Sequence, residues 1–316
     1  MSRQQQKHPI LKKIIKGLTV TTAITGSTFF HGPPVLALGL TKLFKQSKKV
    51  DETNIQITNS WLSVNNWLID HVLTETKWDI SIDPELDLNM QGRYLMSCNH
   101  QSWVDTTVNQ YFGLTRMPLT RFFTKWELIF IPFVGQAFKI LGFPMMKRHS
   151  KQQIAKNPAL KYQDMDEARK ACEHLLSQPF TLLNYLEGTR FTAEKKAQQQ
   201  SPFQNLLKPK AGGLALALNI LGQKIDAFVD MTIIYPDGVP GYGEFWLGEV
   251  PRIVINMRKI NIPDWVIGGD YEDDAEYREK FQQWVDDLWH EKDQLITQIK
   301  QQYHLTSPDS TTDESL

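Results

Sequence analysis

The sequence predicts an α/β fold in which a mixed, mostly parallel sheet is flanked by helices. Two apolar runs, residues 93–98 and 180–187, are short enough to be buried strands. Residues 102–112 have helical character and follow the first run, while a helix that ends at Leu176 precedes the second. Pro179 separates that helix from its strand. Alternating strands and helices are typical of sheets whose neighbouring strands run parallel.

Other helices are indicated by apolar residues that recur every three or four positions. Residues 57–73 form one such segment, which we expect to pack on the core or on a bilayer. The helix that precedes the second strand is expected to begin at Asp164 or Asp166. A long acidic helix is expected from Tyr277, with its apolar stripe packed on the domain, and residues 253–255 are expected to form a further strand.

The chain has 316 residues, enough for one large core with extensions. We expect a basic, apolar N-terminal segment, a main domain, an acidic amphipathic helix and a disordered tail; their boundaries are 1–50, 51–265, 266–305 and 306–316. The two cysteines, Cys98 and Cys172, give neither a disulfide framework nor a metal-ligand spacing, and both fall on apolar faces. The sequence therefore predicts no metal site and is compatible with a reducing cytoplasm.

Charge is distributed unevenly although the net charge is zero. Residues 1–49 carry nine Lys and Arg and no acidic residue, residues 51–269 carry 22 residues of each sign, and the rest carries thirteen acidic and four basic residues. A basic terminus beside an apolar segment favours an anionic membrane surface. Nucleic acid is not expected as a partner, because no recognition motif and no aromatic-interleaved basic stripe accompanies the charge.

Residues 17–40 form an apolar segment of 24 residues in which His31 is the one ionisable side chain. This length would just span a bilayer, but the sequence His31-Gly-Pro-Pro34 interrupts it. Lysines at both ends favour a re-entrant or interfacial hairpin with both ends cytoplasmic, because a single span carries its positive charge on one side. A single spanning helix is the alternative. A cleaved signal peptide is not expected, since no small-x-small site follows.

The most informative motif is Asn99-His100-Gln-Ser-Trp-Val-Asp105, at the predicted exit of the first strand. Positions i and i+5 lie about 140° apart on a helix, so a regular helix would separate the two ionisable side chains. A turn before the helix would instead place His100 outside it and Asp105 in its first turn, with the carboxylate near the imidazole. Such a pair suits a general base acting on a hydroxyl. The alternative is structural, because Ser102-x-x-Asp105 resembles a capping box.

A second motif, Glu187-Gly188-Thr189-Arg190, follows the second predicted strand. Glycine permits a tight turn there, and Arg190 presents a planar group with five donors at the strand's end. Open α/β sheets bind ligands at such ends, and an arginine suits a phosphate or a carboxylate. The chain has no Gly-x-Ser-x-Gly elbow, P-loop or Gly-x-Gly-x-x-Gly, which disfavours a serine hydrolase, an NTPase or a dinucleotide-binding protein.

Together the two motifs resemble those of the glycerolipid acyltransferase family, which contains the lysophosphatidic acid acyltransferases and carries Asn-His-x-x-x-x-Asp and Glu-Gly-Thr-Arg blocks. The resemblance covers residues 90–260, and its last segment is closest to the lysocardiolipin-acyltransferase-like branch. Lys147 is a departure, since many members carry Asp or His there. The supporting segments are Lys125-Trp-Glu-Leu with Pro132 and Gly135, Gly142-Phe-Pro-Met-Met-Lys147-Arg148, Leu206-Leu-Lys-Pro209-Lys210-x-Gly-Gly213 and Val229-Asp-Met-Thr-Ile233.

The resemblance implies a glycerol-3-phosphate acyltransferase-like fold with N-terminal membrane-associated helices and the catalytic domain at residues 51–265. It implies a membrane-bound enzyme of phospholipid biosynthesis that takes a fatty acyl group from acyl-CoA or acyl carrier protein, with no other cofactor. The expected acceptor is the lysophospholipid 1-acyl-sn-glycerol-3-phosphate, which gives phosphatidic acid. The expected location is a bacterial inner membrane with the domain facing the cytoplasm. Another lysolipid such as lysocardiolipin, or a non-catalytic lipid-binding role, is the alternative.

We expect a one-step transfer in which His100 removes the proton of the acceptor hydroxyl while that oxygen attacks the thioester, and Asp105 orients the ring. Asn99 or nearby backbone amides would stabilise the oxyanion. The expected acceptor contacts, implied by the resemblance for the Glu-Gly-Thr-Arg block and by charge for the others, are Glu187, Gly188, Thr189, Arg190, Arg148, Lys147 and Lys210.

Overall fold

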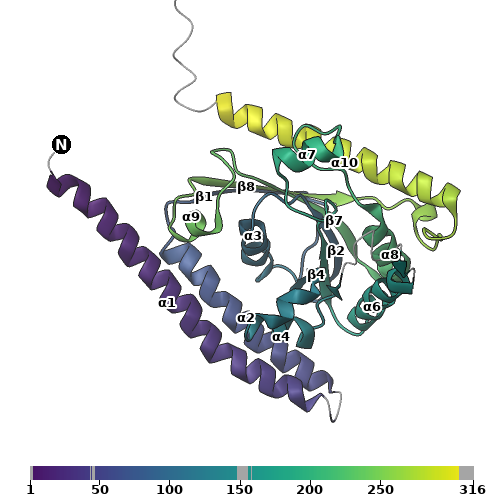
Figure 1. The fold of residues 1–316 in the computed structure, drawn as a ribbon, viewed down its shortest axis with the longest axis horizontal. Helices are drawn as coiled ribbons and strands as arrows, with labels where there is room; N and C mark the ends of the chain where they lie inside the picture. The colour runs from purple at the N-terminus through teal and green to yellow at the C-terminus, as the bar shows by residue number, and fades with distance from the viewer. Residues whose placement is uncertain (1–2, 43, 45–46, 148–155, 158, 306–316) are drawn as a thin grey trace, which may run out of the picture.

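A six-stranded sheet forms the centre of the protein (Figure 1), and the computed structural model describes residues 3–42, 44, 47–147, 156–157 and 159–305. The strand order is β1-β8-β7-β2-β6-β3. The pair β7–β8 is antiparallel and the other pairs of this sheet are parallel, which confirms the predicted mixed, mostly parallel sheet. The strands are β1 (Lys77–Ile82), β2 (Arg93–Cys98), β3 (Thr120–Phe122), β6 (Phe180–Asn184), β7 (Ala227–Ile234) and β8 (Arg252–Ile260), with a separate pair β4 (Thr124–Lys125) and β5 (Met145–Met146).

Helices cover both faces of the sheet (Figure 1). One face carries α1 (Arg3–Thr41), α2 (Lys48–His71), α3 (Val104–Gly113) and α9 (Tyr242–Trp246). The other carries α6 (Ala159–Leu175), α8 (Ala211–Leu221) and α10 (Ala275–Leu305). The remaining elements are the helices α4 (Val134–Ile140) and α7 (Ala193–Gln199) and the 3₁₀ turns η1 (Trp126–Phe130), η2 (Gly222–Lys224) and η3 (Asp264–Val266).

The central strands are mostly apolar because both of their faces are buried. In β2, Tyr94, Met96 and Cys98 pack into the core under α2 and α3. The intervening Leu95 packs into the core under α6 and α8. This period of two explains why residues 93–98 read as one continuous apolar run rather than as an alternating pattern.

The helix α10 packs on α8 and β7 through the apolar stripe that the sequence shows from Tyr277 onward. It is also fixed by a buried charge, because Lys292 is fully buried and its Nζ donates to Asp230 Oδ1 at 2.6 Å and to the Met231 carbonyl at 2.8 Å. Removal of one partner of a buried ion pair strongly destabilises the folded protein, because the other charge is left buried without a partner. Lys292 therefore ties α10 to the middle of β7.

The predicted break at residues 31–34 is wrong, because α1 is one unbroken helix from Arg3 to Thr41. The chain reverses between α1 and α2, which lie side by side (Figure 1). Packing supports the helix through the prolines: His31 Nε2 lies 3.2 Å from Ser60 Oγ on α2, and a Cβ on Gly32 would lie 2.7 Å from Phe133 Cβ. Among the described residues, no helix combines the length and the apolar composition needed to cross a bilayer.

Two other expectations differ from the structure or fall outside it. The helix α6 begins at Ala159, before both acidic residues expected to open it. Asp166 does not cap the helix, since it pairs with Lys170 one turn later at 2.6 Å. The tail 306–316 and Arg148 lie outside the described residues.

Candidate active site

The side chains of His100 and Asp105 lie together at the exit of β2. The strand ends at Cys98 and α3 begins at Val104, so the turn between them is short. Nδ1 of His100 lies 2.9 Å from Oδ2 of Asp105. The histidine side chain is 14% exposed and the aspartate 1%, so the pair is shielded while the imidazole still reaches solvent.

The carboxylate of Asp105 has four hydrogen-bond donors around it. Besides His100, the backbone N–H groups of Gln101 and Ser102 donate to Oδ2 at 2.6 and 2.8 Å. The hydroxyl of Tyr235 donates to Oδ1 at 2.7 Å. Asp105 therefore accepts backbone N–H groups of the turn and pairs with His100 at the same time, while the N-cap of α3 is Trp103 and has no side-chain cap bond. Because Nδ1 faces a carboxylate that can only accept, Nδ1 carries the proton and Nε2 is the nitrogen able to accept one.

Two buried tyrosines complete the surroundings of the imidazole. The ring of Tyr185 stacks on His100 with 4.1 Å between centroids and an angle of 20°. Burial raises the pKa of Tyr185 and of Tyr235 well above the usual value, so Tyr235 keeps the proton that it donates to Asp105. No local spacing signals either tyrosine, because each reaches the pair from the end of a different strand.

A cavity of about 480 Å³ opens beside His100. Three cations line it, from three separate segments: Lys125, Lys147 and Arg190. The guanidinium of Arg190 lies 4.6 Å from the centroid of the Trp103 ring, an arrangement that orients its planar group at the cavity wall. The site therefore offers positive charge, at the end of a strand, next to a histidine base.

Three of the four residues in the Glu-Gly-Thr-Arg turn line this cavity. Gly188, with φ +67°, occupies a backbone region that favours glycine, while the Thr189 hydroxyl accepts a hydrogen bond from Lys195 Nζ at 2.8 Å. Lys195 also donates to the Arg190 carbonyl at 2.9 Å. This lysine of α7 fixes the turn, and no motif in the sequence indicates it.

Glu187 does not line the cavity, which corrects its expected place at the acceptor. Its side chain is fully buried. Oε1 accepts from the backbone N–H of His100 at 2.7 Å, and Oε2 accepts from that of Leu207 at 2.9 Å. The carboxyl group therefore holds the backbone of the histidine in place from behind the cavity.

Asn99 is also placed differently from its expected role at an oxyanion. The residue is fully buried, and its amide bridges to the end of β7. Nδ2 donates to the Ile233 carbonyl and Oδ1 accepts from the Ile233 N–H, both at 2.9 Å. Because both amide atoms are used in this bridge and the side chain does not line the cavity, backbone amides are left as the alternative for an oxyanion.

The two remaining candidates for a phosphate contact are separated by the fold. Lys147 lines the cavity, with Nζ 5.9 Å from the centroid of the Trp126 ring. Lys210 does not line it and packs behind the turn instead, since a Cβ on Gly188 would lie 3.1 Å from its Nζ.

An apolar cavity of about 270 Å³ adjoins the one beside His100. It lies between α1 and α2 on one side and α3 and α4 on the other, and Thr106 and Phe122 border both cavities. Most of its other walls are apolar, including Ile24, Trp61, Leu62, Leu119, Phe138 and Phe143.

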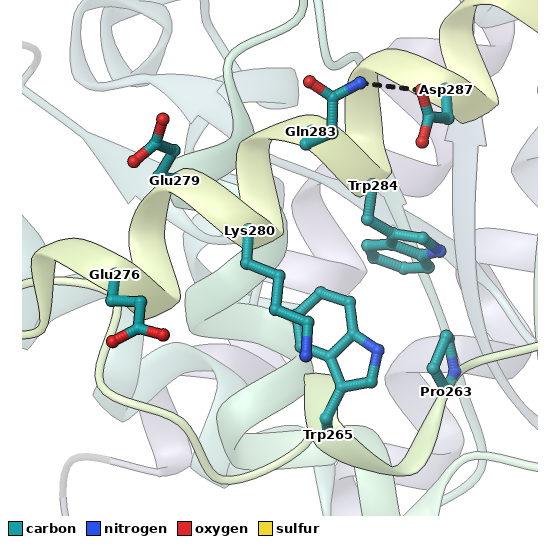
Figure 2. A pocket seen from close by; sticks show the side chains of 8 residues that line it. All are labelled: Pro263, Trp265, Glu276, Glu279, Lys280, Gln283, Trp284 and Asp287. Carbon is teal, nitrogen blue, oxygen red and sulfur yellow. Dashed lines mark hydrogen bonds between the residues drawn. The ribbon is translucent and has the colours of Figure 1, made fainter.

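A different hollow of about 500 Å³ lies between η3 and α10 (Figure 2). Its lysine, Lys280, already lies over the Trp265 ring at 4.3 Å from the centroid, and Gln283 donates to Asp287 at 2.8 Å. It contains no histidine, cysteine or serine. We therefore assign the candidate active site to the cavity beside His100.

Replacement of Glu187 by glutamine is expected to change how stability depends on pH. Burial raises the pKa of Glu187 to about 8, against an ordinary value of 4.5 and against the opposing effect of its two N–H donors. The folded protein thus binds this proton more tightly than the unfolded chain. The stabilisation is complete below about pH 4.5 and is lost as the pH rises to about 8.

The free energy of unfolding of the wild type, relative to Glu187→Gln, should accordingly fall between pH 4.5 and 8. Denaturant titrations at several pH values measure this difference. Glu194→Gln, an exposed site on α7, is the matched control and should show no such fall. Parallel pH profiles for the wild type and Glu187→Gln would contradict the assignment.

The region of the chain that contains this site is similar to known proteins. Residues 80–236 match the family described as Acyltransferase. The chain is 26% identical over 253 residues to the 2-acyl-1-lysophosphatidylinositol acyltransferase of Saccharomyces cerevisiae, covering 66% of this chain and 62% of that protein. It is 24% identical over 267 residues to lysocardiolipin acyltransferase 1 of Mus musculus, covering 78% and 66%. The chain thus spans less than two thirds of the length of these relatives.

A solved structure is also similar, that of the 1-acyl-sn-glycerophosphate acyltransferase from Thermotoga maritima. Its TM-score is 0.47 and its sequence is 17% identical, and the match covers 87% of this chain and 94% of that one.

Proposed function

Because this chain belongs to the acyltransferase family through the domain at residues 80–236, we propose that it transfers a fatty acyl group from an acyl thioester to the free hydroxyl of a lysophospholipid. The observation that carries this proposal is the contact of 2.9 Å between His100 Nδ1 and Asp105 Oδ2, at a cavity lined by three cations. A protein that only binds lipid needs cations and apolar walls, but it has no need for an oriented base.

The chemistry proceeds in one displacement. Nε2 of His100 takes the proton of the acceptor hydroxyl while the oxygen attacks the thioester carbonyl carbon. The C–S bond then breaks, and the proton passes from the imidazolium to the leaving thiolate, which restores the base. Asp105 balances the charge on the ring, and the stacked Tyr185 holds its plane. An acyl thioester is already activated, so the chain needs no covalent nucleophile.

The acceptor is proposed to bind through a phosphate group at Arg190, with Lys147 and Lys125 beside it. The names of the two curated relatives specify a lysophosphatidylinositol and a lysocardiolipin as acceptors, so the headgroup differs between relatives. We propose 1-acyl-sn-glycerol-3-phosphate, whose phosphate is the least encumbered, with phosphatidic acid as the product. Lysocardiolipin is the second candidate. The acyl donor is either acyl-CoA or acyl carrier protein.

The acyl chain of the donor is proposed to enter the apolar cavity that adjoins the site. Its walls are mostly apolar and it meets the cavity beside His100 at Thr106 and Phe122, so a thioester carbonyl at His100 would have its hydrocarbon tail directed toward α1 and α2. Burial of a methylene group contributes about 0.8 kcal/mol, so the chain supplies much of the binding energy.

Replacement of Arg190 by glutamine is expected to raise the KM for 1-acyl-sn-glycerol-3-phosphate and to lower kcat by about tenfold or more, since a lost charge-assisted contact costs about 1.5–3 kcal/mol. An acyl-transfer assay with labelled oleoyl-CoA and a panel of lysophospholipids measures both constants. Lys196→Gln, which removes a half-buried lysine outside the cavity, is the control. Unchanged constants in Arg190→Gln would remove the phosphate assignment, and no product with any lysolipid or donor would favour the non-catalytic alternative.

We also propose that α1 lies on an anionic membrane surface. Leu18, Phe29 and Leu40 are spaced by eleven residues, about three helical turns, and all three are more than half exposed. Leu11, Ile14 and Ile15 extend the exposed stripe toward the N-terminal lysines. An exposed apolar helix face beside basic residues is typical of interfacial helices. A bacterial inner membrane with the domain on its cytoplasmic side stays a prediction from the sequence.

Leu18→Glu together with Phe29→Glu is expected to release the protein from vesicles that contain phosphatidylglycerol, because each carboxylate would have to enter the apolar interface. Sedimentation with the vesicles measures the bound fraction. Gln282→Glu with Gln283→Glu on α10 adds the same charge elsewhere and should leave binding unchanged. Equal binding of both double variants would rule out this face of α1 as the contact.

A further inference from the structure

Arg121 is a buried cation that the proposed chemistry does not use. It lies on β3 and is 1% exposed. Its Nε donates to the Leu141 carbonyl at 2.6 Å, while its Nη1 is buried and has no hydrogen-bond partner among the described residues. A buried guanidinium with an unpaired N–H costs free energy that a native fold normally recovers through a partner.

No described carboxylate forms an ion pair with Arg121, although Asp51 and Glu52 line the same hollow of the protein. The negative charge of Asp51 opposes the lowering of the Arg121 pKa that burial causes. The carboxylate of Asp51, however, pairs with Lys42. Glu52 pairs with Lys48 at 3.8 Å.

Arg121 is one of the residues that line a cavity of about 700 Å³ at the edge of the sheet. This hollow, which we call the Arg121 cavity, shares no lining residue with the cavity beside His100. Asn59 also lines it, and its Oδ1 is a second buried atom without a partner among the described residues. Ser47 and Lys48, at the N-terminal end of the 24-residue helix α2, form another part of the wall, where the helix dipole favours an anion.

We propose that the Arg121 cavity binds a phosphate group, carried either by a free phosphate compound or by the headgroup of an anionic phospholipid. A phosphate oxygen would accept from Nη1 of Arg121. A phosphate that keeps one proton also offers a P–OH donor for Oδ1 of Asn59, which sulfate at neutral pH lacks. The site is separate from the acyl-transfer site and does not depend on its activity.

The first test measures the thermal midpoint of unfolding of the purified full-length protein, in phosphate-free buffer, as inorganic phosphate is added. A ligand that binds only the folded state raises this midpoint in a concentration-dependent way. We expect a saturable rise that is smaller with sulfate. Arg190→Gln, which removes a cation of the other cavity, should keep the part of the rise that comes from the Arg121 cavity. Arg121→Gln should lose it, with binding weakened by about tenfold or more.

A second variant keeps the proposal testable if Arg121→Gln does not fold. Asn59→Asp places a carboxylate on the wall of the Arg121 cavity, where it would pair with the guanidinium and compete with phosphate. Its midpoint without phosphate should match or exceed that of the wild type, while its response to phosphate should shrink. A response equal to that of the wild type would overturn the proposal.

The same measurement in detergent micelles distinguishes the two sources. Phosphatidic acid is compared with phosphatidylcholine at equal concentration, again with Arg121→Gln and Asn59→Asp. A shift that depends on Arg121 with phosphatidic acid but not with inorganic phosphate assigns the site to a lipid headgroup, and a shift with inorganic phosphate assigns it to a free phosphate compound. If neither probe gives a shift that these variants reduce, the proposal is wrong.

Discussion

Replacement of His100 by alanine is expected to abolish acyl transfer. Its Nε2 is the candidate base at the cavity, and a positioned base contributes about 10²–10⁴-fold to a proton transfer. The loss should appear in kcat with each lysophospholipid that the wild type accepts, because the base acts on the hydroxyl and not on the headgroup. An assay with labelled oleoyl-CoA, at saturating acceptor, measures this loss directly.

The fold should survive this change, since the imidazole makes one hydrogen bond through its ring and stacks on Tyr185 at a partly solvated position. His71→Ala is the matched control, because His71 is exposed on α2 and is absent from the residues that line the cavity. Retention of more than about a tenth of the wild-type kcat in His100→Ala would mean that another group takes the proton.

Replacement of Asp105 by asparagine is expected to lower kcat by about 10²–10⁴-fold while the fold is kept. Oδ2 faces three N–H groups, from His100, Gln101 and Ser102, so the amide oxygen must stay on that side. The new NH₂ group then faces Tyr235, whose hydroxyl can turn and accept. The geometry is thus retained, and the negative charge that balances the imidazolium is lost.

Tyr235→Phe separates these two effects. Alone it removes one donor to Asp105 and should reduce kcat by less than Asp105→Asn does. Combined with Asp105→Asn, it leaves the new NH₂ group buried without an acceptor, which costs about 1–3 kcal/mol. Denaturant unfolding of the four proteins should therefore show a destabilising coupling between the two sites. Additive free energies of unfolding, or an unchanged kcat in Asp105→Asn, would contradict this account of the pair.

Local sequence indicated β2, β6 and part of β8, but not β1, β3 or β7, and it indicated the central pair. Residues 93–98 coincide with β2, because an apolar run of that length bounded by a polar turn has few alternatives. The contact between His100 and Asp105 was also predictable from the heptapeptide, since a short turn before a helix brings i and i+5 together whatever packs around it. The two cysteines are buried as expected from their apolar surroundings.

The direction of the other side chains was decided by partners that are distant in sequence. Glu187 and Arg190 belong to one turn, yet Glu187 points inward to the N–H groups of His100 and Leu207 while Arg190 stacks on Trp103. Asn99 adjoins His100 but bonds to Ile233, 134 residues away.

Local pattern was therefore enough for the fold class, for some of the strands and helices, and for the one pair joined by a short turn. Contacts between distant segments set which motif residues face the cavity, which tyrosines support the base, and that α1 continues through Pro33 and Pro34. The physical reason is that a side chain at the end of a strand takes its direction from the groups packed against it. Those groups, such as Tyr235 on Asp105, come from strands that local sequence does not connect.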